Sequence, residues 1–81
     1  MREEILQEKM QTLLDAVGNS SKVEIIDFTK NTVFTKIDTK GFIEYRVYDV
    51  KNDMIFDLAK ETTSLKSAYQ FFLGRITSYI Q

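Results

Sequence analysis

The stretch TVFTKIDTKGFIEYRVYDV, residues 32–50, contains two runs that are rich in β-branched and aromatic residues. Such runs are typical of β-strands. They are separated by DTKG, residues 38–41, which favours a tight turn in which Gly41 serves as a bulge residue. Residues 32–50 therefore predict an antiparallel β-hairpin, and we expect the rest of the chain to pack around it.

The side chains of this hairpin alternate between two faces, because successive residues of a strand point in opposite directions. One face is apolar and is expected to be buried under the helices; it carries Val33, Ile37, Ile43, Tyr45 and Val47. The other face mixes aromatic and charged side chains; it carries Phe34, Lys36, Phe42, Glu44, Arg46 and Tyr48. This second face is either a ladder of stabilising cross-strand pairs or a surface that binds a partner.

Helical spacing of apolar residues predicts one helix on each side of the strand region. The first covers residues 2–17 and ends at Gly18, a common helix stop. The second covers residues 64–80, with Thr63 or Ser64 as its N-cap. Between them, residues 23–28 and 54–58 add a first and a fourth strand, the fourth being the one that could instead form a loop or a helical turn.

Short polar turns between the four runs predict an antiparallel meander. We therefore expect an α+β fold in one domain, residues 1–81. It has an N-terminal helix, a three- to four-stranded antiparallel β-meander and a C-terminal helix, with both helices packed on one sheet face.

The composition excludes several classes of chemistry. The 81 residues include no histidine and no cysteine, which rules out serine–histidine and cysteine–histidine nucleophiles within one chain. The usual zinc ligands are missing for the same reason. Three glycines leave no phosphate-binding loop. We therefore expect a protein that is not an enzyme, with no catalytic residues, no metal and no cofactor.

The charge pattern bears on location and partners. The N-terminal residues 1–11 are charged where a signal peptide would be apolar, and no apolar run reaches the length of a membrane span, so we expect a cytoplasmic protein without membrane association. The net charge of −1 lacks the basic excess of a strong nucleic-acid binder.

The back of the second helix is another candidate surface for a partner. Phe71 lies far from the apolar stripe, and Gly74 costs about 1 kcal/mol in a helix interior relative to alanine. Close approach of another helix or strand would explain both residues, whereas the alternative is a tolerated glycine on a solvated face. The residues predicted to contact a partner here are Ser67, Phe71, Gly74 and Ser78.

These observations favour a small non-catalytic protein-interaction module, for example a regulator or inhibitor such as those of phages and mobile elements. It would bind a protein partner or form a homodimer through the sheet face or the back of the second helix. The alternative is a nucleic-acid-binding domain that uses the sheet face or the start of the second helix. The order α-β-β-β-α resembles the double-stranded RNA-binding domain, and TSLKSAYQFF, residues 63–72, lies where that family begins its second helix. The resemblance implies phosphate contacts there, for which this chain offers Lys66.

Overall fold

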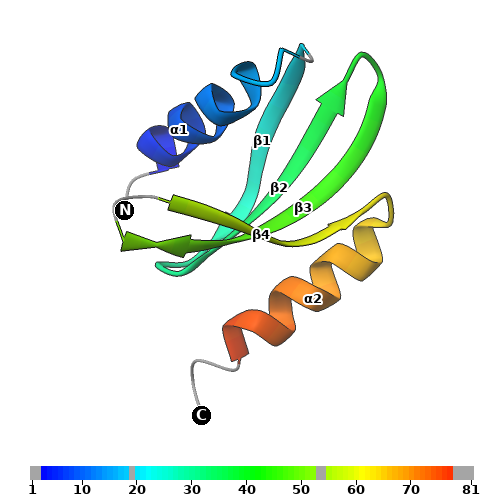
Figure 1. The fold of residues 1–81 in the computed structure, drawn as a ribbon. Coiled ribbons are helices and arrows are strands. Elements are labelled where there is room, and N and C mark those ends of the chain that lie inside the picture. Colours follow the sequence, from blue (N-terminus) through cyan, green and yellow to red (C-terminus); the bar gives the residue numbers. More distant parts are fainter. Residues whose placement is uncertain (1–2, 19, 53–54, 78–81) are drawn as a thin grey trace.

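The computed structural model describes residues 3–18, 20–52 and 55–77 (Figure 1). Two helices enclose four strands in chain order. The elements are α1 (Glu3–Asp15), β1 (Ser21–Phe28), β2 (Thr32–Thr39), β3 (Phe42–Lys51), β4 (Ile55–Thr62) and α2 (Leu65–Thr77). The fourth strand is thus a full strand and longer than the sequence predicts, and the α+β class and the element order are confirmed.

The strands form one antiparallel sheet in the order β1-β2-β3-β4, so each strand pairs with its neighbours in sequence. The two edge strands each contain a β-bulge. In β1, Ile26 is the extra residue between the pairs Ile25–Thr35 and Asp27–Phe34. In β4, Ala59 is the extra residue between Leu58 and Lys60.

The β2–β3 connection is a two-residue turn, Lys40-Gly41, closed by the pair Thr39–Phe42. Lys40 has φ 54° and Gly41 has φ 92°, so both central residues are in the left-handed region. This is the geometry of a type I′ turn, whose twist matches that of the two strands. The bulge predicted at Gly41 is therefore absent, and glycine is needed because the turn itself requires a positive φ.

Both helices end or begin where their local chemistry indicates. α1 is followed by Gly18 with φ 78°, which permits the chain to turn out of the helix. At the start of α2, the Ser64 hydroxyl accepts a hydrogen bond from the Ser67 amide at 3.1 Å. Ser64 is therefore the N-cap, and it satisfies an amide that has no partner within the helix.

The helices pack on opposite faces of the sheet, above and below it in Figure 1. Under α1 lies a core of Leu6, Met10, Leu14, Val23, Ile25, Val33, Ile37 and Tyr48. Under α2 lies a separate core of Phe34, Val47, Ala68 and Phe72. The prediction that both helices share one face is therefore wrong.

The register of the hairpin gives the physical reason. Val33 pairs with Tyr48 and Phe34 pairs with Val47, so the apolar residues of β2 and β3 that were assigned to one face lie on two. Residues directly opposite in antiparallel strands share a face. Since the even-numbered residues of β3 lie with Val33, and the odd-numbered ones with Phe34, each face needs its own cover.

The bulge at Ile26 also changes the face of one predicted side chain. Val23 and Ile25 were expected on one side of β1, with Ile26 and Phe28 on the other. Because of the extra residue, the side chain of Phe28 projects on the same face as Val23 and Ile25, where it packs against the core under α1. Ile26 stays 41% exposed. One added residue in a strand reverses the facing of everything after it.

α2 is attached to the sheet by aromatic packing and by one ion pair. The rings of Phe34 and Phe72 lie 5.5 Å apart, and Phe34 also contacts Tyr69 at 6.3 Å between centroids. Farther along the helix, Arg75 Nε donates to Asp49 Oδ1 at 3.0 Å, and Arg75 Nη2 contacts Asp49 Oδ2. This bidentate contact joins the end of α2 to β3.

Neither helix, as far as each is described, is both long and apolar enough to cross a membrane.

The Asp49–Arg75 contact predicts a pH-dependent loss of stability. The hydrogen bonds from Arg75 lower the pKa of Asp49 below its ordinary value of 3.8, even though partial burial opposes this. The contact therefore stabilises the fold fully above that value, and its contribution disappears as the pH falls through the lower folded-state pKa. We expect Asp49→Asn to reduce the free energy of unfolding by about 1–2 kcal/mol near neutral pH.

The measurement is urea denaturation of both proteins over about pH 2–7. The difference between Asp49→Asn and wild type should shrink below pH 3.8. Glu8→Gln, which likewise replaces a carboxylate by an amide at an exposed position of α1, is the control and should change little. A difference that stays constant across the pH range would contradict the proposed role of the carboxylate.

Candidate functional site

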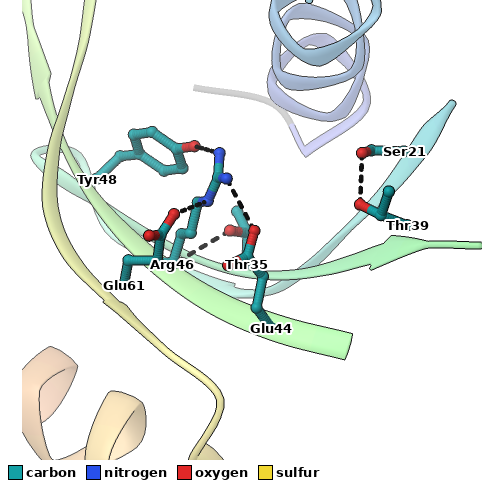
Figure 2. A network of polar contacts seen from close by, with 7 residues as sticks. All are labelled: Ser21, Thr35, Thr39, Glu44, Arg46, Tyr48 and Glu61. Carbon is teal, nitrogen blue, oxygen red and sulfur yellow. Dashed lines mark hydrogen bonds and ion pairs between the residues drawn. The ribbon is translucent and has the colours of Figure 1, made fainter. Parts of the chain in front are cut away.

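A polar network built on Arg46 occupies the α1 side of β3 and β4 (Figure 2). Arg46 Nη2 lies 2.8 Å from Glu44 Oε1, and Arg46 Nη1 donates to the Tyr48 hydroxyl at 3.1 Å. Its Nε lies 2.9 Å from Glu61 Oε2 on the neighbouring strand. Strand periodicity explains the assembly, because residues 44, 46 and 48 share a face and Glu61 is the direct cross-strand partner of Arg46.

The network keeps the guanidinium of Arg46 positively charged and does not favour its loss of a proton. Burial opposes the charged guanidinium, but the hydrogen bond to Tyr48 and the carboxylates of Glu44 and Glu61 outweigh it and raise the pKa of Arg46. The backbone is held as well, since the Thr35 hydroxyl donates to the Arg46 carbonyl at 2.9 Å. With two carboxylates and a phenol around it, Arg46 is a structural cross-link between β3 and β4.

The residues of the predicted open face are divided between the two sides of the sheet. Phe34 is fully buried beneath α2, and Tyr48 is only 4% exposed beneath α1. Both belong to the cores, so neither is available to a partner in the folded chain. Lys36, Glu44 and Arg46 are half-buried, whereas Phe42 is 59% exposed beside the Lys40-Gly41 turn.

The predicted back of α2, as far as it is described, is only partly exposed, because Phe71 packs against the core under α2 instead of standing apart from it. Ser67 and Gly74 are exposed, and Phe71 is half-buried with the Arg75 guanidinium 5.5 Å from its ring centroid. A Cβ at Gly74 would meet nothing within 4 Å, so no close contact among the described residues requires this glycine. Ser78 lies outside the described residues.

The outer edge of β1 is closed by two glutamines of α1. Gln11 Nε2 donates to the Ser21 carbonyl at 2.8 Å, and its Oε1 accepts from the Val23 amide at 3.0 Å. One helical turn earlier, Gln7 Nε2 donates to the Val23 carbonyl at 2.5 Å, and its Oε1 accepts from the Ile25 amide at 3.3 Å.

Each glutamine thereby replaces one residue of a neighbouring strand. The side-chain amide of each glutamine bonds to the carbonyl of one β1 residue and to the N–H of the β1 residue two positions later. A residue of a neighbouring parallel strand forms the same pair of bonds. The spacing of four residues puts both amides on the same side of α1. Carboxylates also line this side, namely Glu3, Glu4, Glu8, Asp15 and Glu24. The β1 edge is therefore closed to another strand by bonds and by negative charge.

The outer edge of β4 has no such cover. Within the described part of the chain, and leaving Arg75 aside, no side chain bonds to the backbone of β4. Two large apolar side chains stand beside this edge, Ile55 at 58% exposure and Leu58 at 51%. An uncovered edge strand flanked by exposed apolar residues is a template for pairing with another strand.

The sequence contains a signal for this asymmetry, but a weak one. Gln7 and Gln11 border the apolar stripe of α1, where a polar residue spaced by four could contact a sheet edge. Nothing in the spacing alone indicates which strand lies beside them. For β4, the alternation of Phe56 and Leu58 with charged residues indicates a strand, but its position at the edge follows from the pairing order.

Comparison with protein-family models, with curated proteins and with solved structures finds no match to this chain.

The capping role of the glutamines is tested by the double variant Gln7→Met/Gln11→Met, which keeps side-chain length but removes the amides. We expect the free energy of unfolding to fall by about 1–3 kcal/mol, because backbone groups of β1 lose their partners. In hydrogen exchange, the amides of Val23 and Ile25 should lose protection. Lys9→Met, at an exposed position of α1 outside this group of side chains, is the control. Unchanged exchange at both amides would show that the glutamines do not cap the strand.

The cross-link at Arg46 is tested by comparing Arg46→Ala with Arg46→Lys. We expect Arg46→Ala to destabilise the fold by about 2 kcal/mol, because Glu44 is left partly buried without its cation. Lysine should restore only part of this, since one ammonium lacks the planar fork of guanidinium donors. Thermal or urea unfolding measures both effects. Lys66→Ala, at an exposed position of α2, should lie within about 0.5 kcal/mol of wild type. Full recovery by lysine would contradict the assigned geometry.

Proposed function

We propose that the protein is a non-catalytic protein-interaction module that binds an extended strand of a protein partner along the outer edge of β4. The observation that carries this proposal is the contrast between the two edges of the sheet. Gln7 and Gln11 cap β1, whereas among the described residues, Arg75 aside, no side chain caps the eight-residue strand β4. Proteins that bind peptides by strand addition use such an edge, because backbone hydrogen bonds supply affinity and flanking side chains supply specificity.

Two features of β4 restrict which strand can bind. The bulge at Ala59 interrupts the regular spacing of backbone groups, so a regular strand cannot pair along the whole edge. Asp57 and Lys60 flank the bulge and select against strands with the wrong charges. These features oppose indiscriminate aggregation and favour one matched partner.

A regulatory or inhibitory role agrees with this mode of binding, because a small domain without histidine or cysteine acts most simply by occupying a partner's surface. Nucleic-acid binding has less support. Arg46 is engaged by two carboxylates, and Lys36 is directly opposite Glu24 in β1. Neither cation presents the unneutralised positive surface that phosphate binding uses.

The test is site-specific photo-crosslinking in the cells that produce the protein. A photoreactive phenylalanine analogue replaces Leu58 beside the open edge, or Ile26 on the capped strand as the matched control. Both positions are exposed and apolar, so the two variants differ mainly in the edge that they report on. We expect a discrete protein adduct from position 58 and none from position 26.

An adduct of any defined protein mass at position 58 alone supports the proposal. The proposal is wrong if both positions crosslink equally, or if neither does while far-UV circular dichroism shows that the variants are folded. The adduct mass also separates a second copy of this chain from another protein.

A further inference from the structure

We infer that the strand that β4 accepts is β4 of a second copy, paired antiparallel about a two-fold axis at the Ala59 bulge, with Asp57 of each copy facing Lys60 of the other. This rests on the proposed function, because it assigns the partner of the same edge. The inference follows from the directions of backbone groups, from the faces of the charged side chains, and from the register that satisfies both.

The directions of the β4 backbone groups follow from the pairing of β3. The Val50 amide donates to the Asn31 carbonyl, so the even-numbered residues of β3 turn their backbone groups toward β2. The odd-numbered residues must then turn theirs toward β4. Their partners in β4 are Ile55, Asp57, Lys60 and Thr62. Phe56 and Glu61 lie between these partners and therefore direct their backbone groups outward.

The bulge puts Asp57 and Lys60 on the same face although they are three residues apart. Asp57 is opposite Asp49, and Lys60 is opposite Val47, so both project on the α2 side. In a regular strand, residues three apart project on opposite faces. Ala59 is thus the reason that an anion and a cation lie on the same face at the open edge.

One two-fold register agrees with both observations. With the axis at the bulge, Phe56 of one copy is opposite Glu61 of the other, and these outward groups form the hydrogen-bonded pairs. Asp57 is then opposite Lys60 of the second copy, in the closer, non-hydrogen-bonded position, and this pair occurs twice. In both pairings, the two side chains that lie opposite each other project on the same face of the combined sheet.

Alternative two-fold registers are less favourable. An axis at Phe56 pairs only the beginning of the strand and leaves Lys60 without a partner. An axis at Glu61 places two carboxylates directly opposite each other, which is destabilising. The central register extends over the full strand, and it joins two four-stranded sheets into one of eight. It also brings the exposed Leu58 of each copy close to the axis.

The experiment uses charge reversal in the purified full chain. Asp57→Lys gives a copy with two cations at the edge, and Lys60→Glu gives a copy with two anions. Each variant should pair poorly with itself, with dimerisation weakened by about tenfold or more. An equimolar mixture should pair well, because each cation then faces an anion. Lys9→Glu, which reverses a charge at an exposed site of α1 away from β4, is the control.

Sedimentation velocity over a range of concentrations measures the association. We expect about 19 kDa, twice the chain mass of 9.5 kDa, for wild type, for Lys9→Glu and for the mixture. The single variants should shift toward monomer. A monomeric wild type at millimolar concentration overturns the inference, as does a mixture no tighter than its components.

These failures can be told apart from failure of the proposed function. A monomeric wild type together with an adduct of different mass at position 58 leaves strand addition in place and removes only the second copy. The mixing arm does not depend on the stability of either variant alone, since restored association in the mixture shows that both chains fold.

Discussion

The structure depends on one constraint, that β2 is buried on both of its faces. Val33 and Phe34 are adjacent in sequence, yet each is fully buried in a different core. A strand of this kind cannot be covered by helices on one side, because alternate side chains would then face water. Opposite placement of α1 and α2 follows directly. The division into two small cores also means that each helix has few deeply buried residues, three in α1 and two in α2.

Because the two helices lie on opposite faces of the sheet, they stand in different positions relative to its two edge strands. α1 contacts mainly β1, so its polar flank reaches the edge of that strand and can supply Gln7 and Gln11. α2 lies across β2, β3 and β4 on the other face, where Ser64 and Arg75 fix its two ends. From this position α2 covers the second core, and in the part of the chain that is described, Arg75 aside, no side chain caps the outer side of β4. The two edges therefore differ because the two helices serve different faces.

Local sequence patterns were sufficient for the elements but not for their arrangement. Apolar spacing placed the end of α1 within two residues and the start of α2 within one residue of those observed, while the predicted residues 2 and 78–80 lie outside the described part of the chain. Ser64 and Gly18 were recognisable from the chemistry of capping. The prediction of which residues share a sheet face was wrong for a simple reason. Alternation shows which residues of one strand lie on the same face, but it does not show which residues of the next strand lie on that face with them. That depends on the turn: Lys40-Gly41 pairs residue 39 with residue 42, and this puts Val33 beside Tyr48. No residue pattern marks the bulges at Ile26 and Ala59. The capping role of Gln7 and Gln11 could not be predicted either, because the sequence does not show which strand lies beside α1.

The Ala59 bulge links the architecture of the monomer to its open edge. Without it, β4 after Leu58 would reverse its facing, so Glu61 would project away from Arg46 and the cross-link between β3 and β4 would be lost. The same extra residue brings Asp57 and Lys60 to one face and breaks the regular edge pattern that promotes aggregation. Side chains of a helix, such as those of α1 on β1, are not the only means of preventing an exposed edge strand from pairing indiscriminately. An irregular edge that carries charges of both signs favours a strand with the matching irregularity, and the proposed pairing with β4 of a second copy supplies that match by symmetry.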